Sequence, residues 1–559
     1  MGWSSRLLCL VLIYAVTSQA RKCKCAPGDF CWPSDSDWAA FNTTVDWRLL
    51  RTELPAAVCY PGSANYNRAA CESVITAWND PAFHSSDPVS NYLPPWANNS
   101  CNPIYENGTS TAGDTLAGSR GFTLGKYPRY SVNATTTEHI QAAVRFAKDR
   151  NLRLNVKNTG HNPKRVLIWT HSMKKIQYVD SFEPACTTNS TTTYSQRSGS
   201  QKAFTVGPGI QDGEIFHAAA NLSLAVVGGS NSDVGLAGRE FGMGADNVIQ
   251  AEVVLPSGNI VVANECQNVD LFWAIRGGGS STFGVITELT VKAHPMPQTT
   301  TWTFSATKTT NDTSAWWKLL AQIHDELPAL KAGGRQGYYS IVGPPSSSAL
   351  TFGGTFNLYN KPNGTAEPLI QPVISLLEEA NERATYSSSI TWAATWIEVF
   401  DALGGQGNSA GLGGSASTSR LLPATSLTHN LDYLADVLEL ISPGDNPKAG
   451  LSNPTIAGCL IASTNPVDNA LNPAWRNTTV HVVVAETWKD STPYTQTWIT
   501  NDLMTNVRGA ALRSLAPGTG VYYNAADDFE PEWQQSLWSE NYQHLRAIKL
   551  KDDPSHLQW

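Results

Sequence analysis

The sequence predicts a mixed fold, either α+β or α/β, arranged in two large lobes. With 559 residues, the chain is too long for one ordinary hydrophobic core. Helix-like and strand-like periodicities alternate between residues 121 and 297, as in "FTVGPGIQDGEIFHAAANLSLAVVGG" at 204–229. From residue 298 onward the strands become rich in Trp and Thr and the helices become longer, which indicates a second lobe.

The amino terminus is typical of a secretory signal peptide, which we place at residues 1–20. Arg6 precedes an apolar run from Leu7 to Val16, and Ser18-Gln19-Ala20 supplies the small residues of a cleavage site. This run is too short to cross a bilayer, and no later stretch reaches the roughly 20 apolar residues of a membrane helix. The sequence therefore predicts a secreted protein without a membrane partner.

Cysteines and sequons agree with this route. Six of the ten cysteines lie in an extension at residues 21–120, where we expect disulfides rather than a zinc site. Nine cysteines remain after cleavage, so at least one of Cys186, Cys266 and Cys459 is expected to form no disulfide within the chain. Nine sequons are candidate glycosylation sites: Asn42, Asn98, Asn107, Asn133, Asn189, Asn221, Asn311, Asn363 and Asn477.

Charge excludes one class of partner. The chain has 39 basic and 47 acidic residues and no long run of like charge. Nucleic-acid binding proteins instead concentrate basic residues on one face or along one helix. The sequence therefore predicts no nucleic-acid partner.

The first periodic unit follows the extension. Thr135 and Glu138 have the spacing of a capping box, which predicts a helix start. The helical stripe behind it consists of Ile140, Ala143, Val144 and Ala147. Leu152 to Val156 then alternates as a strand does and leads into the turn Thr159-Gly160-His161. Farther along, Pro256 to Asn259 has the composition of a hairpin turn between two apolar strands.

Motif chemistry narrows the function by elimination. The chain contains no Gly-x-Ser-x-Gly elbow, no His-Glu-x-x-His metal motif, no Walker loop, and no Gly-x-Gly-x-x-Gly opening a helix. It does contain glycine-dense turns around Gly160, Gly207, Gly228 and Gly279. Because glycine lets backbone N–H groups approach a pyrophosphate or a planar ring, these turns together suit a large phosphate-bearing cofactor. No motif indicates a metal site.

Several stretches carry a resemblance to a known family. They are "PRYSVNATTTEHIQAAVRFAKDRNLRLNVKNTGHN", "GADNVIQAEVVLPSGNIVVAN", "DLFWAIRGGGSSTFGVITELTVKAHP" and the segment from "YYNAADDFEPEW" to "KDDPSHL". They resemble secreted fungal FAD-linked oxidoreductases of the berberine-bridge-enzyme-like group, and "CKCAPGDFCWP" is similar to isoamyl-alcohol-oxidase-type proteins.

The resemblance implies the α+β fold of vanillyl-alcohol oxidase and p-cresol methylhydroxylase. It implies a PCMH-type FAD-binding domain at residues 121–297 and a second α+β domain, for the substrate, at 298–505. A carboxyl-terminal segment at 506–559 is expected to return to the FAD domain. In many relatives, the residue that corresponds to His161 is bonded to the flavin 8α-methyl group; the alternative is a solvent-facing turn histidine.

Other residues receive roles from the same resemblance. The remaining cofactor-binding residues are expected to be Gly160, Gly228, Gly229, Gly279 and Asn524. Tyr522 is expected to be the catalytic base, with its pKa lowered from about 10 by a neighbouring cation. The alternative is a core tyrosine whose hydroxyl is merely hydrogen-bonded. Asn231 stands where doubly linked relatives have a second flavin-bonding cysteine, so a single link is expected.

The implied reaction is oxidation of an alcohol or a secondary-metabolite intermediate, with hydride transfer to flavin and oxygen as the acceptor. Two departures from the family pattern stand against it. Asn162-Pro163 replaces a glycine-rich stretch, and Arg239 follows Gly238 where relatives carry a second such turn. A wrongly spliced gene, a real truncation, and compensation by Lys164 and Arg165 each explain these gaps. The alternative function is therefore an inactive secreted glycoprotein that keeps the fold.

Overall fold

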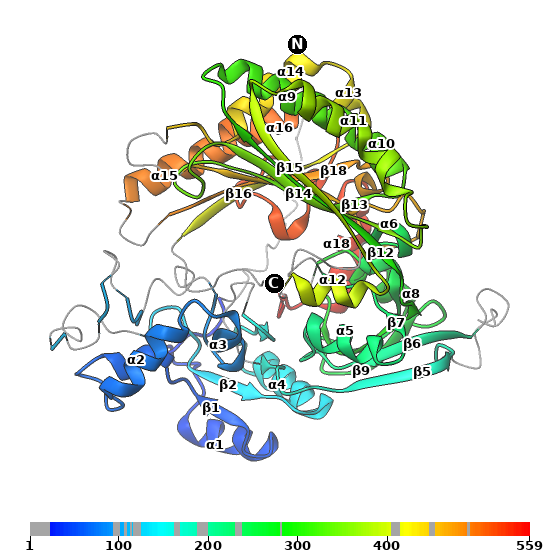
Figure 1. The fold of residues 1–559 in the computed structure, drawn as a ribbon. Helices are drawn as coiled ribbons and strands as arrows, with labels where there is room; N and C mark the ends of the chain where they lie inside the picture. Colours follow the sequence, from blue (N-terminus) through cyan, green and yellow to red (C-terminus); the bar gives the residue numbers. More distant parts are fainter. Residues whose placement is uncertain are drawn as a thin grey trace, which may run out of the picture.

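The computed structural model places two lobes one above the other, with the amino-terminal extension beside the lower one (Figure 1). It describes residues 23–92, 101–104, 109–111, 114–115, 124–160, 168–186, 200–229, 238–279, 282–403, 414–446, 453–488, 492 and 494–558. No helix among these residues is both long enough and apolar enough to cross a membrane.

The first lobe contains two sheets. A mixed sheet has the order β1-β2-β4-β3, in which β2, β4 and β3 run parallel, while β1 is antiparallel to β2. An antiparallel sheet has the order β5-β6-β10-β8-β9. The strands are β1 (Leu49–Arg51), β2 (Tyr130–Asn133), β3 (Val156–Lys157), β4 (Ile168–Trp169), β5 (Ile176–Phe182), β6 (Gln201–Val206), β8 (Val248–Val254), β9 (Ile260–Asn264) and β10 (Val285–Lys292). The hairpin predicted at Pro256 to Asn259 joins β8 to β9, and Gly258 takes the positive φ that the turn requires.

Short helices complete this lobe. They are α4 (Thr137–Asp149), α5 (Asp212–Ala220), α6 (Gly238–Phe241), α7 (Gly244–Asn247) and α8 (Val269–Ile275), with a two-stranded pair of β7 (Leu224–Ala225) and β11 (His294–Pro295). The predicted stripe of α4 is confirmed, because Ile140, Ala143, Val144 and Ala147 are fully buried.

The predicted cap of α4 is wrong by one residue. Thr136 is the N-cap, and its hydroxyl accepts a hydrogen bond from the His139 N–H group. His139 therefore occupies the position that the prediction gave to Glu138. Adjacent threonines offer two equivalent starts, and the burial of the helix selects between them.

The amino-terminal extension has more regular structure than its composition indicates. It contains α1 (Asp35–Thr44), α2 (Arg68–Ala77), α3 (Pro81–Ser86) and the 3₁₀ turn η1 (Pro55–Cys59). Each α-helix has a side-chain cap, from Ser34, Asn67 and Asp80 respectively. The extension is rich in Pro, Asn, Ser and Trp and shows little periodicity, which predicts loops. That prediction missed these helices because side-chain caps, rather than apolar periodicity, define them.

Three disulfides join described residues. They link Cys25 to Cys31, Cys59 to Cys71, and Cys186 to Cys266. The prediction of disulfides in the extension is confirmed for four of its cysteines. Cys23 and Cys101 of the extension form no disulfide, so the expectation fails for these two. Cys459 also remains a thiol, in line with the expectation that at least one of the three later cysteines forms no disulfide within the chain.

The second lobe is a seven-stranded antiparallel sheet with helices on one face (Figure 1). Its order is β15-β12-β14-β13-β17-β18-β16. The strands are β12 (Thr299–Lys308), β13 (Gln336–Val342), β14 (Thr351–Tyr359), β15 (Ala384–Ala393), β16 (Ser415–Leu422), β17 (Thr455–Leu460) and β18 (Val480–Thr487). The helices are α9 (Thr313–Asp325), α10 (Leu327–Ala332), α11 (Ala366–Glu379), α12 (Trp396–Ala402), α13 (Ala424–Thr428), α14 (Leu431–Ile441), α15 (Tyr494–Leu503) and α16 (Gly509–Leu515), with the turn η5 (Pro473–Asn477) and the π-helical η6 (Met504–Arg508).

The carboxyl-terminal segment connects both lobes. Leu512 and Leu515 of α16 belong to the core of the second lobe. The chain then passes through η7 (Tyr523–Ala525) and α17 (Trp533–Trp538) to α18 (Asn541–Asp552). There Leu545 and Ile548 pack with Leu271 and Phe272 of α8, so the chain ends against the first lobe.

Candidate functional site

The predicted glycine turn lies at the carboxyl end of a parallel strand pair. Strand β3 ends at Lys157 and strand β4 ends at Trp169. Residues Asn158 to Gly160 follow β3 directly. Ligands of sheets with parallel strands bind beyond these ends. Gly160 has a φ of +90°, and a Cβ atom there would lie 2.7 Å from the carbonyl oxygen of Ser90. Glycine is therefore required both by the turn and by the close approach of the extension.

The extension is held against this turn by a buried cation. The Lys157 ammonium donates to the backbone carbonyls of His84 at 3.1 Å and of Asp87 at 2.5 Å. Burial lowers the pKa of Lys157 to about 8. The N–H group of Tyr92 also donates to the Gly160 carbonyl at 3.2 Å. The extension thus fixes the turn that precedes His161.

Unsatisfied polar atoms gather around the same turn. Asn91 Oδ1, Asn158 Oδ1 and His171 Nδ1 are buried and have no hydrogen-bond partner among the described residues. Asn158 Nδ2 donates to the Ile210 carbonyl, and the backbone of His171 adjoins Gly209, so these two residues border the Gly207 to Ile210 turn. Asn91 lies beside Gly160, where a Cβ atom would be 3.6 Å from the Asn91 Cα atom. Buried orphan groups of this kind require an explanation. A cofactor with many polar atoms, such as FAD, fits these residues.

His171 packs just beyond the end of β4. Its ring stacks on Trp169, with centroids 5.5 Å apart and planes at 4°. Burial is the main cause that lowers the pKa of His171, and two nearby lysines add to it. The neutral ring can accept or donate one hydrogen bond at Nδ1, depending on its tautomer.

The other predicted glycines are required for different reasons. A Cβ atom at Gly228 would overlap the Phe216 ring at 2.3 Å, so this glycine serves helix packing. At Gly229 a Cβ atom would lie 3.2 Å from the Asp212 carboxylate. Gly279 has a φ of +112°, and a Cβ atom there would lie 3.4 Å from the Thr282 hydroxyl oxygen and 3.9 Å from the Tyr523 ring. Gly279 therefore lies beside the segment that carries Tyr522 and Asn524.

Tyr522 and Asn524 contact one another directly. Asn524 Nδ2 donates to the Tyr522 hydroxyl oxygen at 2.9 Å. The Tyr522 ring meets the edges of Trp475 and His481, with centroids 5.7 and 5.8 Å apart. Desolvation raises the pKa of Tyr522, and among the residues that the structure describes no cation acts on it. The expectation that a neighbouring cation lowers this pKa is therefore wrong.

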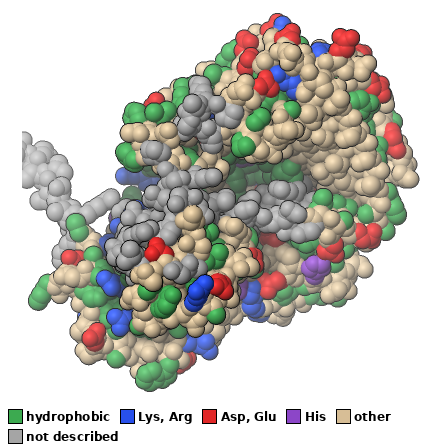
Figure 2. All heavy atoms as spheres, turned by 60° about the vertical axis from the view of Figure 1, so that its left-hand side comes forward, with side chains coloured by type: hydrophobic (Ala, Val, Ile, Leu, Met, Phe, Trp, Pro, Cys, Tyr) green, Lys and Arg blue, Asp and Glu red, His purple; other side chains and the backbone are tan. Residues whose placement is uncertain are grey.

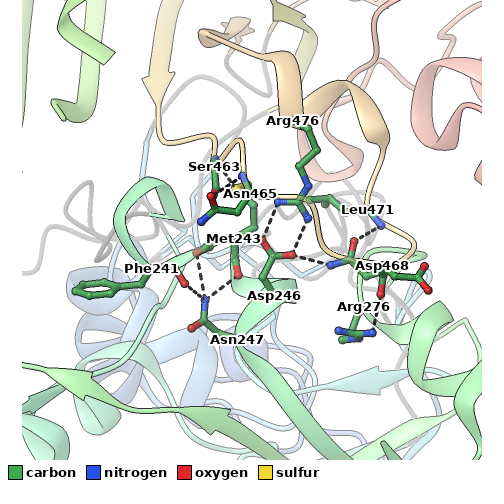
Figure 3. A network of polar contacts seen from close by, with 12 residues as sticks. Phe241, Met243, Asp246, Asn247, Arg276, Ser463, Asn465, Asp468, Leu471 and Arg476 are labelled. Carbon is green, nitrogen blue, oxygen red and sulfur yellow. Dashed lines mark hydrogen bonds and ion pairs between the residues drawn. The ribbon is translucent and has the colours of Figure 1, made fainter. Parts of the chain in front are cut away.

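A polar junction joins the lobes near this point (Figure 3). Asp246 of α7 is 4% exposed and accepts two hydrogen bonds from the Arg476 guanidinium, at 2.7 and 2.8 Å. Asn469 donates to Asp246 at 2.7 Å, and the N–H group of Met243 does so at 2.8 Å. The carboxylate thus fixes the first lobe against η5 of the second.

Some predicted site residues lie outside the described part of the chain. His161 and the shortened loop after it fall in residues 161–167, and Asn231 falls in residues 230–237. The molecular surface is hollowed between the two lobes (Figure 2). The hollow lies between the two lobes that carry the Gly160 turn and the Tyr522 cluster.

Comparisons with known proteins identify the family. Residues 128–264 match the model of an FAD binding domain, and residues 521–559 match that of berberine and berberine-like proteins. The chain is 30% identical to the FAD-linked oxidoreductase ZEB1 of Gibberella zeae, over 98% of this chain and 93% of that protein. It is 31% identical to the FAD-linked oxidoreductase patO of Aspergillus clavatus, over 96% and 90%. This chain belongs to the FAD-linked oxidoreductases.

Similarity to solved structures supports the same family assignment. The VAO-type flavoprotein MtVAO713 from Myceliophthora thermophila superposes with a TM-score of 0.84 at 27% identity, covering 96% of both chains. Glucooligosaccharide oxidase from Acremonium strictum shares the fold at 19% identity, with a TM-score of 0.57 over 77% of this chain and 90% of that one. That enzyme carries a 6-S-cysteinyl, 8α-N1-histidyl FAD. The predictions of the α+β flavoprotein fold, of FAD and of an oxidoreductase are confirmed.

Sequence reasoning missed one residue of the candidate site. His481 of β18 is 3% exposed, its Nε2 atom has no partner among the described residues, and its ring touches Tyr522. Burial lowers the pKa of His481 to about 3, so the ring is neutral at neutral pH. In the sequence "VHVVVAET" the histidine lies within an apolar strand and carries no local signal of function. Only the strand register, which pairs His481 with Leu421, shows which face of the sheet carries the histidine.

Proposed function

We propose that the oxidoreductase oxidises a small alcohol or a secondary-metabolite intermediate, with oxygen as the electron acceptor. When bound, FAD supplies the acceptor for the hydride. The observation that carries the proposal is the contact of Asn524 with the Tyr522 hydroxyl, in the segment that lies beside Gly279. In the proposal, Tyr522 is the proton-accepting group, and the polar turn at Gly160 supplies groups suited to the flavin.

Tyr522 takes the substrate proton in this proposal. As the hydride leaves the carbinol carbon, the hydroxyl proton passes to the phenolate of Tyr522, and the product is a carbonyl compound. The hydrogen bond from Asn524 stabilises the phenolate. Because burial raises the pKa of Tyr522, the phenolate fraction is small at neutral pH and grows as the pH rises.

The test is the pH profile of turnover in Tyr522→Phe. We expect kcat to fall by about 10² to 10⁴, the usual contribution of a general base, and its rise at alkaline pH to disappear. Peroxide release from a panel of primary alcohols gives the rate. Tyr433→Phe is the matched control, because Tyr433 is an exposed tyrosine on α14. A Tyr522→Phe enzyme with both rate and alkaline rise intact would refute the assignment.

The FAD is held through a single covalent link to His161 in this proposal. The histidyl link of glucooligosaccharide oxidase and the place of His161 directly after the Gly160 turn support it. Asn231 supplies no thiol for a second link. Acid-precipitated protein should keep its flavin, and the peptide containing His161 should carry the added mass. Flavin that is released completely by acid would contradict the link.

We also assign the protein to the secretory route, which three disulfides support. Among the sequons, Asn221, Asn311, Asn363 and Asn477 are exposed and are proposed to carry glycans. Asn42 uses its side-chain oxygen to accept from the Leu49 N–H group, and Asn133 lies within β2. Glycopeptide mapping of the secreted protein tests this division; Asn98, Asn107 and Asn189 lie outside the described residues. No feature of the described residues favours the alternative of an inactive glycoprotein.

A further inference from the structure

A second cavity lies in the amino-terminal part of the molecule. It measures about 600 Å³ and is bounded by the Cys25–Cys31 loop, by α1, and by the two segments that lead into β2 and toward β3. This volume lies in the range of pockets that hold small molecules. None of its lining residues belongs to the Gly160 turn or to the Tyr522 cluster.

The charged residues that line the cavity are all basic among those that the structure describes. Four cations line the cavity, namely Lys24, Lys126, Arg129 and Arg153, and no carboxylate is among the described lining residues. The protein as a whole has a net charge of −8, so a cationic cavity runs against its overall balance. Clefts lined by one sign of charge concentrate ions of the opposite sign. Lys24 interacts with Asp553, but this carboxylate is already bonded to Lys549 and to two backbone N–H groups.

Aromatic side chains form the remaining wall. Trp38 and Tyr130 stack with centroids 4.2 Å apart, and Trp32 lies 5.6 Å from Trp38. Trp38 is 4% exposed, and its Nε1 donor has no acceptor among the described residues. Buried indole N–H groups usually find a partner, so this donor without one is a group that a ligand in the cavity could satisfy after a small side-chain shift.

We propose that this cavity binds a small aromatic carboxylate. The ring would lie against Trp32, Trp38 and Tyr130, while the carboxylate accepts from Lys126 and Arg129 at the rim. A neutral aromatic ring would lack the ionic contacts, and an aliphatic anion would lack the stacking. The site is separate from the flavin site and is independent of the function proposed above.

The experiment uses full-length, flavin-loaded protein and 2-naphthoate as the probe, with tryptophan fluorescence and calorimetry as readouts. We expect saturable binding that weakens with salt, and no comparable binding of neutral 2-naphthylmethanol. Lys126→Ala/Arg129→Ala should weaken binding by at least about ten-fold, because two charge-assisted hydrogen bonds are lost. Both residues are exposed, so the fold should tolerate the change.

Two controls separate this cavity from other sites. Lys361→Ala removes an exposed cation elsewhere and should leave the affinity unchanged. Trp38→Phe keeps an aromatic ring but removes the donor, and it should weaken binding to a smaller extent. The proposal is overturned if 2-naphthoate does not bind, if it binds no better than the alcohol, or if the double variant binds it with unchanged affinity.

Discussion

The two faces of the seven-stranded sheet are built by the same strands and have opposite chemistry. In β12, Trp302 and Phe304 point toward the helices, whereas Thr301 and Thr303 point the other way. Paired residues of neighbouring strands lie on the same face, so the strand register extends this division across the sheet. The helix-covered face includes Phe352, Phe356, Tyr339, Ile341, Ile456, Val482 and Val484, and the opposite face includes Thr355, Tyr338, Ser340, Cys459, His481 and Ser419.

The difference explains how one sheet serves two purposes. Its apolar face forms the core with α9, α11 and α14. On its polar face, Leu421 packs with Met243 of the first lobe and with Trp475, and His481 meets Tyr522. Because alternate residues of a strand point to opposite sides, one face stabilises the lobe while the other forms a wall of the site.

The largest expected effect is on the covered face. Trp302 is fully buried, stacks on Phe304 and Phe356, and donates to the Ser388 hydroxyl. Trp302→Ala should lower the free energy of unfolding by about 3–5 kcal/mol, because a large cavity remains and the hydrogen bond to the Ser388 hydroxyl is lost. Urea unfolding, followed by tryptophan fluorescence and circular dichroism, measures the loss.

Its neighbour provides the comparison. Thr303 lies on the opposite face, is exposed, and makes one long hydrogen bond to Thr355 at 3.4 Å. Thr303→Ala should change the free energy of unfolding by less than about 0.5 kcal/mol. Equal losses in the two variants would show that the faces do not differ as described.

A second prediction concerns the junction under the polar face. Arg476→Met leaves the buried Asp246 carboxylate without its bidentate partner, which should cost about 3 kcal/mol of unfolding free energy. Lys318→Met is the control, because its pair with Asp432 is exposed, and a loss of at most about 0.5 kcal/mol is expected. Thermal unfolding of both variants checks the ranking. If the two variants lose the same stability, the junction does not lock the lobes.

The sequence predicts the parts of this molecule that depend on local order. Apolar periodicity locates α4 and the strands of the β8–β9 hairpin, and the family resemblance singles out the turn at Gly160 as a candidate flavin site. Contacts between distant residues leave no local signal. Asp246 and Arg476 are 230 residues apart, and Lys157 meets carbonyls 70 and 73 residues away. Likewise, the face of the sheet on which the His481 side chain lies becomes clear only once the strand register is known.

The last prediction compares the buried histidines on the two faces of the seven-stranded sheet. His324 of α9 lies on the covered face, where Nδ1 contacts the Leu320 carbonyl at 2.7 Å and Nε2 contacts the Tyr339 hydroxyl at 2.8 Å. Burial lowers the pKa of His324 to about 4, below the unfolded value of about 6.5.

Between these two pKa values the unfolded chain binds more protons than the folded chain, so His324 contributes stability above pH 6.5 that is lost as the pH falls toward 4. The loss from one such histidine is at most about 1.4 kcal/mol per pH unit. His324→Gln should remove this part of the slope in urea unfolding between pH 7 and pH 4.5, whereas His481, neutral on the other face, should keep its own part in that variant. An unchanged slope in His324→Gln would mean that His324 titrates alike in the folded and unfolded chains, and that its closed hydrogen bonds do not exclude the proton.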